Sequence, residues 1–214
     1  MIPAKTMKPK AESILEVAGE IFAEQGFRKT TVREICKRSG VNLAAINYYF
    51  GDKDHLYLGC LKYYQSIAAQ KVLPYFGINI TASPKKKLTT FIHTFIFRLL
   101  EEGKQTLFGK LLAREFFEPT GALDVLVEES IKPSFNLLSS IVREVLGNNC
   151  ADTEVELCTM SILGQCLYFR NAQPIIFRLR NKDAFSEEDI KEIAEHIINF
   201  SLKALDNYFK KEIQ

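Results

Sequence analysis

The chain has 214 residues, 47% of them hydrophobic, which is enough to bury a substantial core in one or two domains. Its formal net charge of +2 is too small to indicate a nucleic-acid or membrane partner by itself. The positive charge lies towards the amino-terminal end, because residues 1 to 64 carry ten Lys or Arg against seven Asp or Glu, whereas residues 65 to 214 carry eighteen against nineteen.

Cysteine usage and hydropathy argue against a secreted or membrane-spanning protein. The scattered cysteines form no CxxC pair, which favours buried thiols in a reducing cytoplasm over disulfides or a zinc site. They are Cys36, Cys60, Cys150, Cys158 and Cys166. The stretch MIPAKTMKPKAES lacks the apolar segment of a secretory signal, and the most apolar run, at 91 to 100, is half as long as a membrane span. We therefore predict a cytoplasmic protein without a membrane partner.

Apolar residues recur at spacings of three and four along nearly the whole chain, which predicts an all-α fold. The first helical stripe runs from Ile14 to Phe22 and stops at Gly26, a residue type that commonly ends helices. A polar joint, TASPKKK at 81 to 87, precedes the later helices. We predict one helical domain at residues 1–60 and a larger helical domain at 61–214.

Two short helices follow the first. Thr31 begins one of them, and Glu34 three residues later completes the pattern of a capping box. That helix ends at Gly40. Asn42 is a good cap for the next helix, which Gly51 closes.

Longer helices make up the rest of the chain. Asp52 caps one that runs towards Pro74. Five further helical patterns, separated by Gly and Pro residues, cover 85–102, 104–118, 122–146, 153–171 and 187–210. Pro133 falls inside the third of these, so we expect the helix to kink or end there, as at Pro74. Ser186, followed by three acidic residues, is a strong cap for the last helix.

The two short helices and the turn at Gly40 have the spacing of a helix-turn-helix. In the second of them, Ile46, Tyr49 and Phe50 share one side and are expected to join an apolar nucleus. The opposite side carries Leu43, Ala44, Asn47 and Tyr48, with Ala45 at the margin. Such a face suits a DNA major groove, because alanine allows close approach to the bases and Asn can pair with adenine.

Groups that can hold phosphates flank this face. Thr31 and Asn42 expose helix amino termini, and Lys53 lies in the first turn of the following helix. A basic rim consists of Arg28, Lys29, Arg33, Lys37 and Arg38. The rim alone is explained equally well as a solvated surface, but together these residues predict an interface with double-stranded DNA.

The stretch GFRKTTVREICKRSGVNLAAINYYFGDKDHLY resembles the DNA-binding signature of the TetR family of bacterial one-component repressors. The resemblance extends from Ile14 to Leu58 and is carried by Gly26, Thr31, Ile35, Gly40, Val41, Tyr49, Phe50, Lys53 and Leu56. Family members most often have a tyrosine where this chain has Asn47, which implies a different base preference. Segments 114–133 and 162–179 resemble the CecR-like branch of the family.

The resemblance implies that the remainder of the chain binds an effector and forms dimers. We predict a homodimer in the bacterial cytoplasm that binds a palindromic operator and is released by an unknown small-molecule effector. Repression is the expected role, and the sequence leaves open whether the protein represses transcription, activates it or does both. Patterns 153–171 and 187–210 are the expected dimer interface. Their apolar stripes include Leu157, Met160, Leu163, Leu167, Ile193, Ile197, Leu202, Leu205 and Phe209.

Candidates for the effector pocket are polar residues within apolar segments. His93 interrupts an apolar run, and the others are Arg114, Gln165, Tyr168 and Arg170. A hydrogen-bond network in the core explains these residues equally well. The three histidines lie too far apart to indicate a metal site, and we expect neither a metal nor a cofactor.

Three other hypotheses compete with DNA binding. The two short helices could be an ordinary helical hairpin, and the chain could be a small-molecule carrier that never contacts DNA. An all-helical enzyme would have to rely on isolated residues such as Glu115 or Glu118. Catalysis has little support, because the chain contains no GxSxG, HExxH, phosphate-binding glycine loop or dinucleotide-binding fingerprint.

Overall fold

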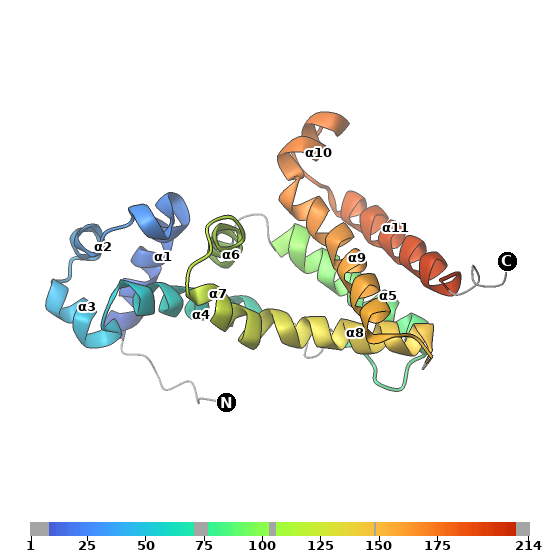
Figure 1. The fold of residues 1–214 in the computed structure, drawn as a ribbon. Coiled ribbons are helices and arrows are strands. Elements are labelled where there is room, and N and C mark those ends of the chain that lie inside the picture. The colour runs from blue at the N-terminus through green and yellow to red at the C-terminus, as the bar shows by residue number, and fades with distance from the viewer. Residues whose placement is uncertain (1–8, 71–76, 103–105, 148, 209–214) are drawn as a thin grey trace. The chain divides into compact units, whose positions relative to one another are not determined.

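The computed structural model describes residues 9–70, 77–102, 106–147 and 149–208. Every regular element in these ranges is helical, which confirms the predicted all-α fold (Figure 1). The elements are α1 (Pro9–Lys29), α2 (Val32–Ser39), α3 (Leu43–Phe50), α4 (Lys53–Gln70), α5 (Pro84–Phe97), η2 (Arg98–Glu102), α6 (Leu107–Phe117), α7 (Ala122–Leu126), η3 (Val127–Ile131), α8 (Lys132–Leu146), α9 (Asp152–Asn171), α10 (Gln173–Arg180) and α11 (Glu187–Asp206).

The helices form two compact units, each with its own apolar core. Unit 1 contains α1 to α4 together with α6 and α7, and unit 2 contains α5, η2 and α8 to α11. Helix α6 packs on α1 and α4, and α7 packs on α4, so both belong to the unit of the helix-turn-helix although they follow the predicted boundary at residue 60. The assignment of DNA binding to 1–60 and effector binding to 61–214 stays a prediction.

The amino-terminal helix changes direction at Gly26. This residue has φ +80° and ψ 167°, values outside the helical region, and the chain then completes one further turn to Lys29. The hydroxyl of Thr30, which is buried, donates a hydrogen bond of 2.8 Å to the Gly26 carbonyl and stabilises this turn. The predicted interruption at Gly26 is thus confirmed.

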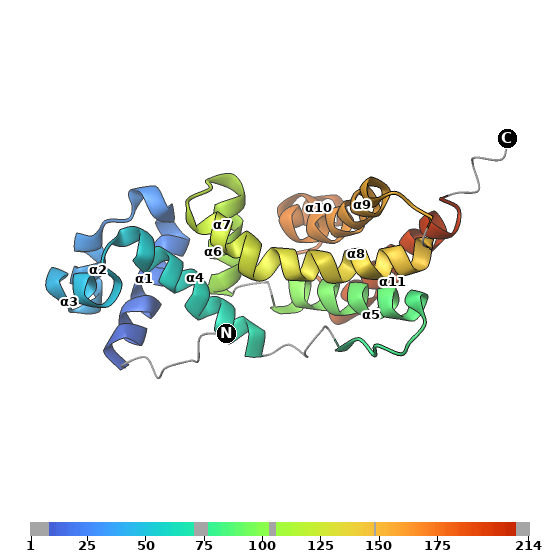
Figure 2. The same cartoon turned by 60° about the horizontal axis from the view of Figure 1, so that its bottom comes forward.

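Unit 2 is built around α5. This helix packs along α11 on one side and α8 on another, and α8 also packs against α9 (Figure 2). Leu88, Phe91, Ile92 and Ile96 of α5 are fully buried because their spacing of three and four residues places them on one face. They form the centre of the unit 2 core.

The predicted helix at 122–146 is divided by the π-helical segment η3, which ends just before Pro133. Proline has no backbone N–H and its ring collides with the carbonyl four residues earlier, so regular α geometry cannot continue through it. A π-helical turn accommodates such an interruption within an otherwise continuous helix. The predicted irregularity at Pro133 is confirmed, whereas Pro74 lies outside the described residues.

No helix is predicted where α10 lies, because it falls between the patterns 153–171 and 187–210, where a Pro is expected to separate helices. Pro174 instead lies in the first turn of α10, where a missing N–H costs nothing because that N–H would have no partner within the helix. Ser186 caps α11 as predicted, since its hydroxyl accepts a hydrogen bond from the Asp189 N–H and Asp189 in turn accepts one from the Ser186 N–H. No helix in the described ranges is long and apolar enough to cross a membrane.

Candidate nucleic-acid interface

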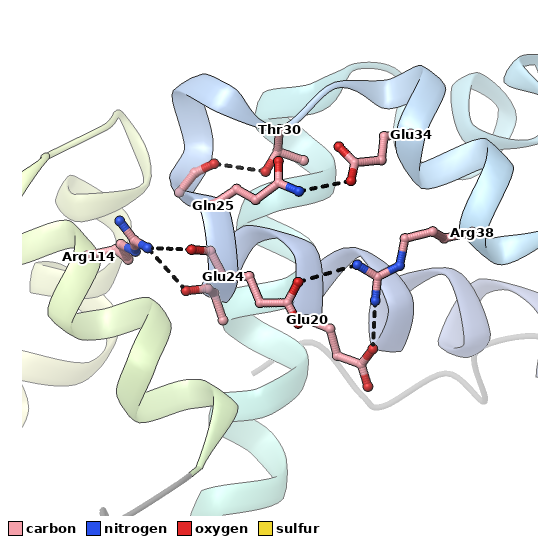
Figure 3. Close-up of polar contacts among 9 residues, drawn as sticks. Glu20, Glu24, Gln25, Thr30, Glu34, Arg38 and Arg114 are labelled. Atoms are coloured by element: carbon pink, nitrogen blue, oxygen red, sulfur yellow. Dashed lines mark hydrogen bonds and ion pairs between the residues drawn. The ribbon is translucent and has the colours of Figure 1, made fainter.

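Both short helices of the helix-turn-helix begin with the predicted caps. The Thr31 hydroxyl accepts a hydrogen bond of 3.2 Å from the Glu34 N–H, and the Asn42 side chain accepts one of 2.9 Å from the Ala45 N–H. The Glu34 carboxylate, which a capping box would direct back to Thr31, accepts a hydrogen bond from Gln25 Nε2 at 2.9 Å (Figure 3). It therefore joins α2 to α1.

The turn between the short helices requires a left-handed residue. Gly40 has φ +68° and ψ 22°, and its position at the end of α2 lets the Val41 N–H donate to the Cys36 carbonyl at 3.2 Å. A residue with a side chain would be strained at this φ. The glycine thus sets the direction in which α3 leaves α2.

The faces of α3 lie as the sequence predicts. Ile46 is only 1% exposed and joins the unit 1 core, with Tyr49 and Phe50 packed beside it. On the opposite side Leu43 is 56% exposed and Tyr48 is 74% exposed. Ala44 and Asn47 are also exposed, and Ala45 is half-buried. Large apolar side chains left in solvent on a capped, rigid helix indicate a contact surface.

The basic rim divides into two groups. Arg28, Lys29, Arg33 and Lys37 lie around the helix-turn-helix, and all four are exposed. The guanidinium of Arg38 instead contacts the carboxylates of Glu20 and Glu24, each at 3.4 Å, and so joins α2 to α1 (Figure 3). Arg38 was predicted as part of the phosphate-holding rim, but its charge is already paired within unit 1.

Lys53 begins α4 next to α3. The preceding Asp52 caps this helix by accepting a hydrogen bond of 2.9 Å from the His55 N–H, and that bond holds the pKa of the Asp52 carboxyl below its ordinary value. The Lys53 ammonium lies 4.3 Å from the centre of the Phe27 ring, which is a cation–π contact. The ring in turn packs against Tyr57, with 5.1 Å between ring centres.

A buried carboxylate joins α4 to α6 within unit 1. Glu115 is 1% exposed and accepts hydrogen bonds from the Tyr57 hydroxyl at 2.8 Å and from the Thr120 N–H at 3.0 Å. Burial, followed by the hydrogen bond to Glu115, raises the pKa of the Tyr57 hydroxyl above its ordinary range. Sequence reasoning considered Glu115 only as an isolated catalytic residue, because a carboxylate in REFFEP gives no local sign of its distant partner.

Arg114, predicted in the effector pocket, also lies in unit 1. Its guanidinium donates hydrogen bonds to the carbonyls of Glu24 at 2.7 Å and Ala23 at 3.4 Å, so it joins α6 to α1 just before the Gly26 turn (Figure 3). It also lines an open surface hollow of about 340 Å³ with Lys110 and Phe117. Arg114 therefore belongs to unit 1, whereas the other pocket candidates belong to unit 2.

The remaining pocket candidates do not line a common described cavity. His93 is exposed and stacks on Phe97 with 4.6 Å between ring centres, and Gln165 Nε2 donates to the Ser161 carbonyl at 3.3 Å. Tyr168 is exposed, and burial lowers the pKa of Arg170. A hollow of about 430 Å³ in unit 2 is lined by α10 and the following loop instead. The effector site stays a prediction.

The predicted dimer stripes fall into buried and exposed sets. Ile193, Ile197 and Leu205 are at most 6% exposed because they form the subunit's own core, and they are therefore not surface residues in this conformation. Leu163, Leu167 and Leu202 pack partly against the same core, and Phe209 lies outside the described residues. Leu157 and Met160 are 60% and 50% exposed. Periodicity correctly located an apolar face on α11, but that face packs inwards.

Comparison with known proteins identifies families for both the helix-turn-helix region and the later helices. The family of bacterial regulatory proteins named tetR matches residues 14–60, and the carboxy-terminal domain of the HTH-type transcriptional dual regulator CecR matches residues 84–205. CecR of Shigella flexneri is 29% identical over 196 residues, covering 87% of each chain. The fatty acid metabolism regulator protein of Bacillus subtilis is 25% identical over 75% of this chain and 81% of its own.

Solved structures share the fold. AibR, crystallised with isovaleryl coenzyme A and operator DNA, has a TM-score of 0.62 at 16% identity, covering 89% of this chain and 97% of AibR. A TetR transcriptional regulator from Agrobacterium tumefaciens has a TM-score of 0.64 at 14% identity, covering 92% and 94% of the two chains. The family consists of DNA-binding transcriptional regulators and not of enzymes. The chain therefore belongs to the TetR family of bacterial regulatory proteins, in the branch defined by the carboxy-terminal domain of CecR.

Proposed function

We propose that this regulator is a homodimeric repressor that binds a palindromic operator and releases it when a small-molecule effector binds. The observation that carries the proposal is the outward face of α3, where Leu43, Ala44, Asn47 and Tyr48 are exposed beside two capped helix amino termini. An uncharged face flanked by groups that hold phosphates suits base readout in the major groove.

Two copies of this face are needed for useful specificity. Helix α3 has eight residues and is about 12 Å long, so one copy reaches only a few base pairs. Two copies related by a twofold axis read both halves of a palindrome. Asn47 contacts a base in this proposal, whereas Lys53 and the amino termini of α2 and α3 hold phosphates.

Exposed apolar side chains on α9 and α11 are the proposed dimer surface. Leu157 and Met160 on α9 and Phe200 on α11 are each at least half exposed, although the two helices pack against each other within unit 2. We expect Leu157→Asp combined with Met160→Asp to convert the dimer to a monomer in sedimentation experiments. Phe117→Asp on α6, which removes an even more exposed apolar side chain outside the proposed surface, should leave a dimer. A wild-type monomer at micromolar concentration would contradict the proposal.

The proposed effector acts through unit 2, with His93, Gln165, Tyr168 and Arg170 as candidate contacts. Isovaleryl coenzyme A is the first probe to use, because AibR shares the fold and was crystallised with it. An effector that couples to DNA should change operator affinity by about 1 to 3 kcal/mol, and DNA should change effector affinity equally. Calorimetry with and without operator measures both changes, and a saturating ligand without effect on the operator is not the effector.

A gel-shift assay on DNA upstream of the gene tests operator binding, and selection from random DNA tests for a palindrome. Lys53→Ala should weaken binding to all sequences alike and lower the salt slope by about one, because the ammonium no longer neutralises a phosphate. Asn47→Ala should instead change preference at one base position by about 1 to 3 kcal/mol. A uniform loss of affinity from both variants would contradict the separate roles of these residues.

Activation is a second candidate function, because the CecR relative is a dual regulator. A reporter fused to the selected operator separates the two. If the protein represses transcription, deletion of its gene should raise reporter expression. If it activates transcription, the deletion should lower reporter expression.

A further inference from the structure

Lys53 occupies an electrostatically unfavourable place. It is the first residue of α4, where the helix dipole presents its positive end and disfavours an ammonium group. Its flexible side chain also loses conformational freedom when it is held against a phosphate. A group that holds the ammonium before DNA binds would reduce both costs.

The Phe27 ring supplies such a group. The Lys53 ammonium lies 4.3 Å from the ring centre, and an aromatic face attracts a cation. The ring is itself held in place, because it stacks on Phe22 at 6.1 Å and packs against Tyr57 at 5.1 Å between ring centres. The Gly26 turn, with its positive φ, brings this ring out of the regular path of α1.

The same aromatic cluster extends to α6. Tyr57 lies four residues after Lys53 on α4, so the two side chains share one face of the helix. The Tyr57 hydroxyl donates to the buried Glu115 carboxylate at 2.8 Å, and Thr120 donates to that carboxylate from its N–H and its hydroxyl. A buried carboxylate is costly unless it accepts hydrogen bonds. Glu115 therefore favours the orientation of the Tyr57 ring in which the hydroxyl donates to it.

We propose that Phe27 is a positioning residue for the phosphate contact of Lys53, and that Glu115 sets the place of the Phe27 ring through Tyr57. The proposal rests on the function proposed for Lys53 above. In this proposal α6 is connected to the phosphate contact of Lys53 through the side chains of Glu115, Tyr57 and Phe27, none of which contacts DNA.

A double-mutant cycle tests the role of Phe27. Phe27→Leu removes the aromatic face but keeps an apolar side chain, and should weaken operator binding about two- to fivefold per half-site. In a Lys53→Ala background the same substitution should have no further effect, because the cation is gone. Phe27→Tyr keeps the aromatic face and should bind like the wild type. An equal loss of affinity in both backgrounds, or no loss in either, overturns the proposal.

The salt slope of Lys53→Ala keeps the two proposals distinguishable. An unchanged slope refutes the phosphate contact itself, whereas a lowered slope with no coupling to Phe27 refutes only the positioning role. If Phe27→Leu fails to fold, proton NMR of the wild type tests whether the Lys53 side chain is held against the Phe27 ring. The ε-methylene signals of Lys53 should be shifted upfield by the ring in DNA-free protein, and unshifted signals overturn the proposal.

Tyr57→Phe tests the connection to α6, because it removes only the hydroxyl that bonds Glu115. We expect a reduction of operator affinity smaller than that of Phe27→Leu, and the reduction should disappear in the Lys53→Ala background. A reduction of the same size in both backgrounds, or none at all, overturns the connection from α6.

Discussion

Polar side chains join helices in both units, but among the described residues only unit 1 joins two helices through a carboxylate and a partner side chain that are both buried. In unit 1 the buried Glu115 accepts a hydrogen bond from Tyr57 and so joins α6 to α4. Arg114 joins α6 to α1 through the carbonyl of Glu24, just before Gly26. In unit 2 the ion pair of Lys85 with Asp206, which joins α5 to α11, is exposed. A partly buried polar contact between helices there is the weaker hydroxyl pair of Ser139 and Thr159.

This difference has a physical consequence for each unit. A hydrogen bond has a direction and a narrow range of lengths, so it fixes how two helices lie against each other. An apolar contact fixes mainly the volume between helices, and apolar cores tolerate repacking. The arrangement suits the roles proposed above, in which unit 1 presents α3 in one fixed position and unit 2 adapts to an effector.

The largest expected effect comes from the buried carboxylate of unit 1. Glu115→Ala leaves the Tyr57 hydroxyl and the Thr120 N–H without this acceptor, and should lower the free energy of unfolding by about 3 kcal/mol. Urea unfolding followed by circular dichroism measures this change. Glu118→Ala, in the exposed residue three positions later, is the matched control and should change stability by less than about 0.5 kcal/mol. A decrease below about 1 kcal/mol for Glu115→Ala would remove the contrast between the units.

Local chemistry made the helix ends and the faces of α3 predictable. The caps Thr31, Asn42 and Ser186 act on N–H groups three residues away, so the sequence alone contains both partners. The spacing of Ile46, Tyr49 and Phe50 likewise fixes the inward side of one short helix.

Long-range partners were not predictable in this way. Nothing near Arg114 in the sequence indicates the carbonyl of Glu24, and nothing near Glu115 indicates Tyr57, because these contacts exist only after α6 packs on α1 and α4. Periodicity gave the apolar face of α11 correctly, but it does not state what that face packs against. Ile193 and Ile197 therefore looked like interface residues although they belong to the core.

A smaller, pH-dependent effect is expected at the start of α11 in unit 2. The hydrogen bond with Lys182, followed by those from Ser186, lowers the pKa of Asp189 below its ordinary value. A lowered pKa contributes stability above the unfolded-state value of about 4, and this contribution is lost as pH falls through the folded-state value. Asp189→Asn should therefore be less stable than the wild type at neutral pH, with the difference shrinking in acid. Thermal melts from pH 7 to below pH 4 measure it. A constant difference would show that the charge of Asp189 does not contribute.

The smallest expected effect concerns two buried hydroxyls of unit 2. The Thr159 hydroxyl donates to the Val155 carbonyl at 2.7 Å and accepts from Ser139 at 3.3 Å, whereas the buried Ser201 hydroxyl has no hydrogen-bond partner among the described residues. Removing a bonded hydroxyl costs about 1 kcal/mol, while removing an unsatisfied one is neutral or stabilising. Thr159→Val should therefore destabilise the protein, and Ser201→Ala should leave it equally stable or slightly more stable in urea unfolding. If Ser201→Ala destabilised the protein as much as Thr159→Val, the Ser201 hydroxyl would be satisfied in solution, and the interior of unit 2 would contain a further polar contact besides that of Thr159.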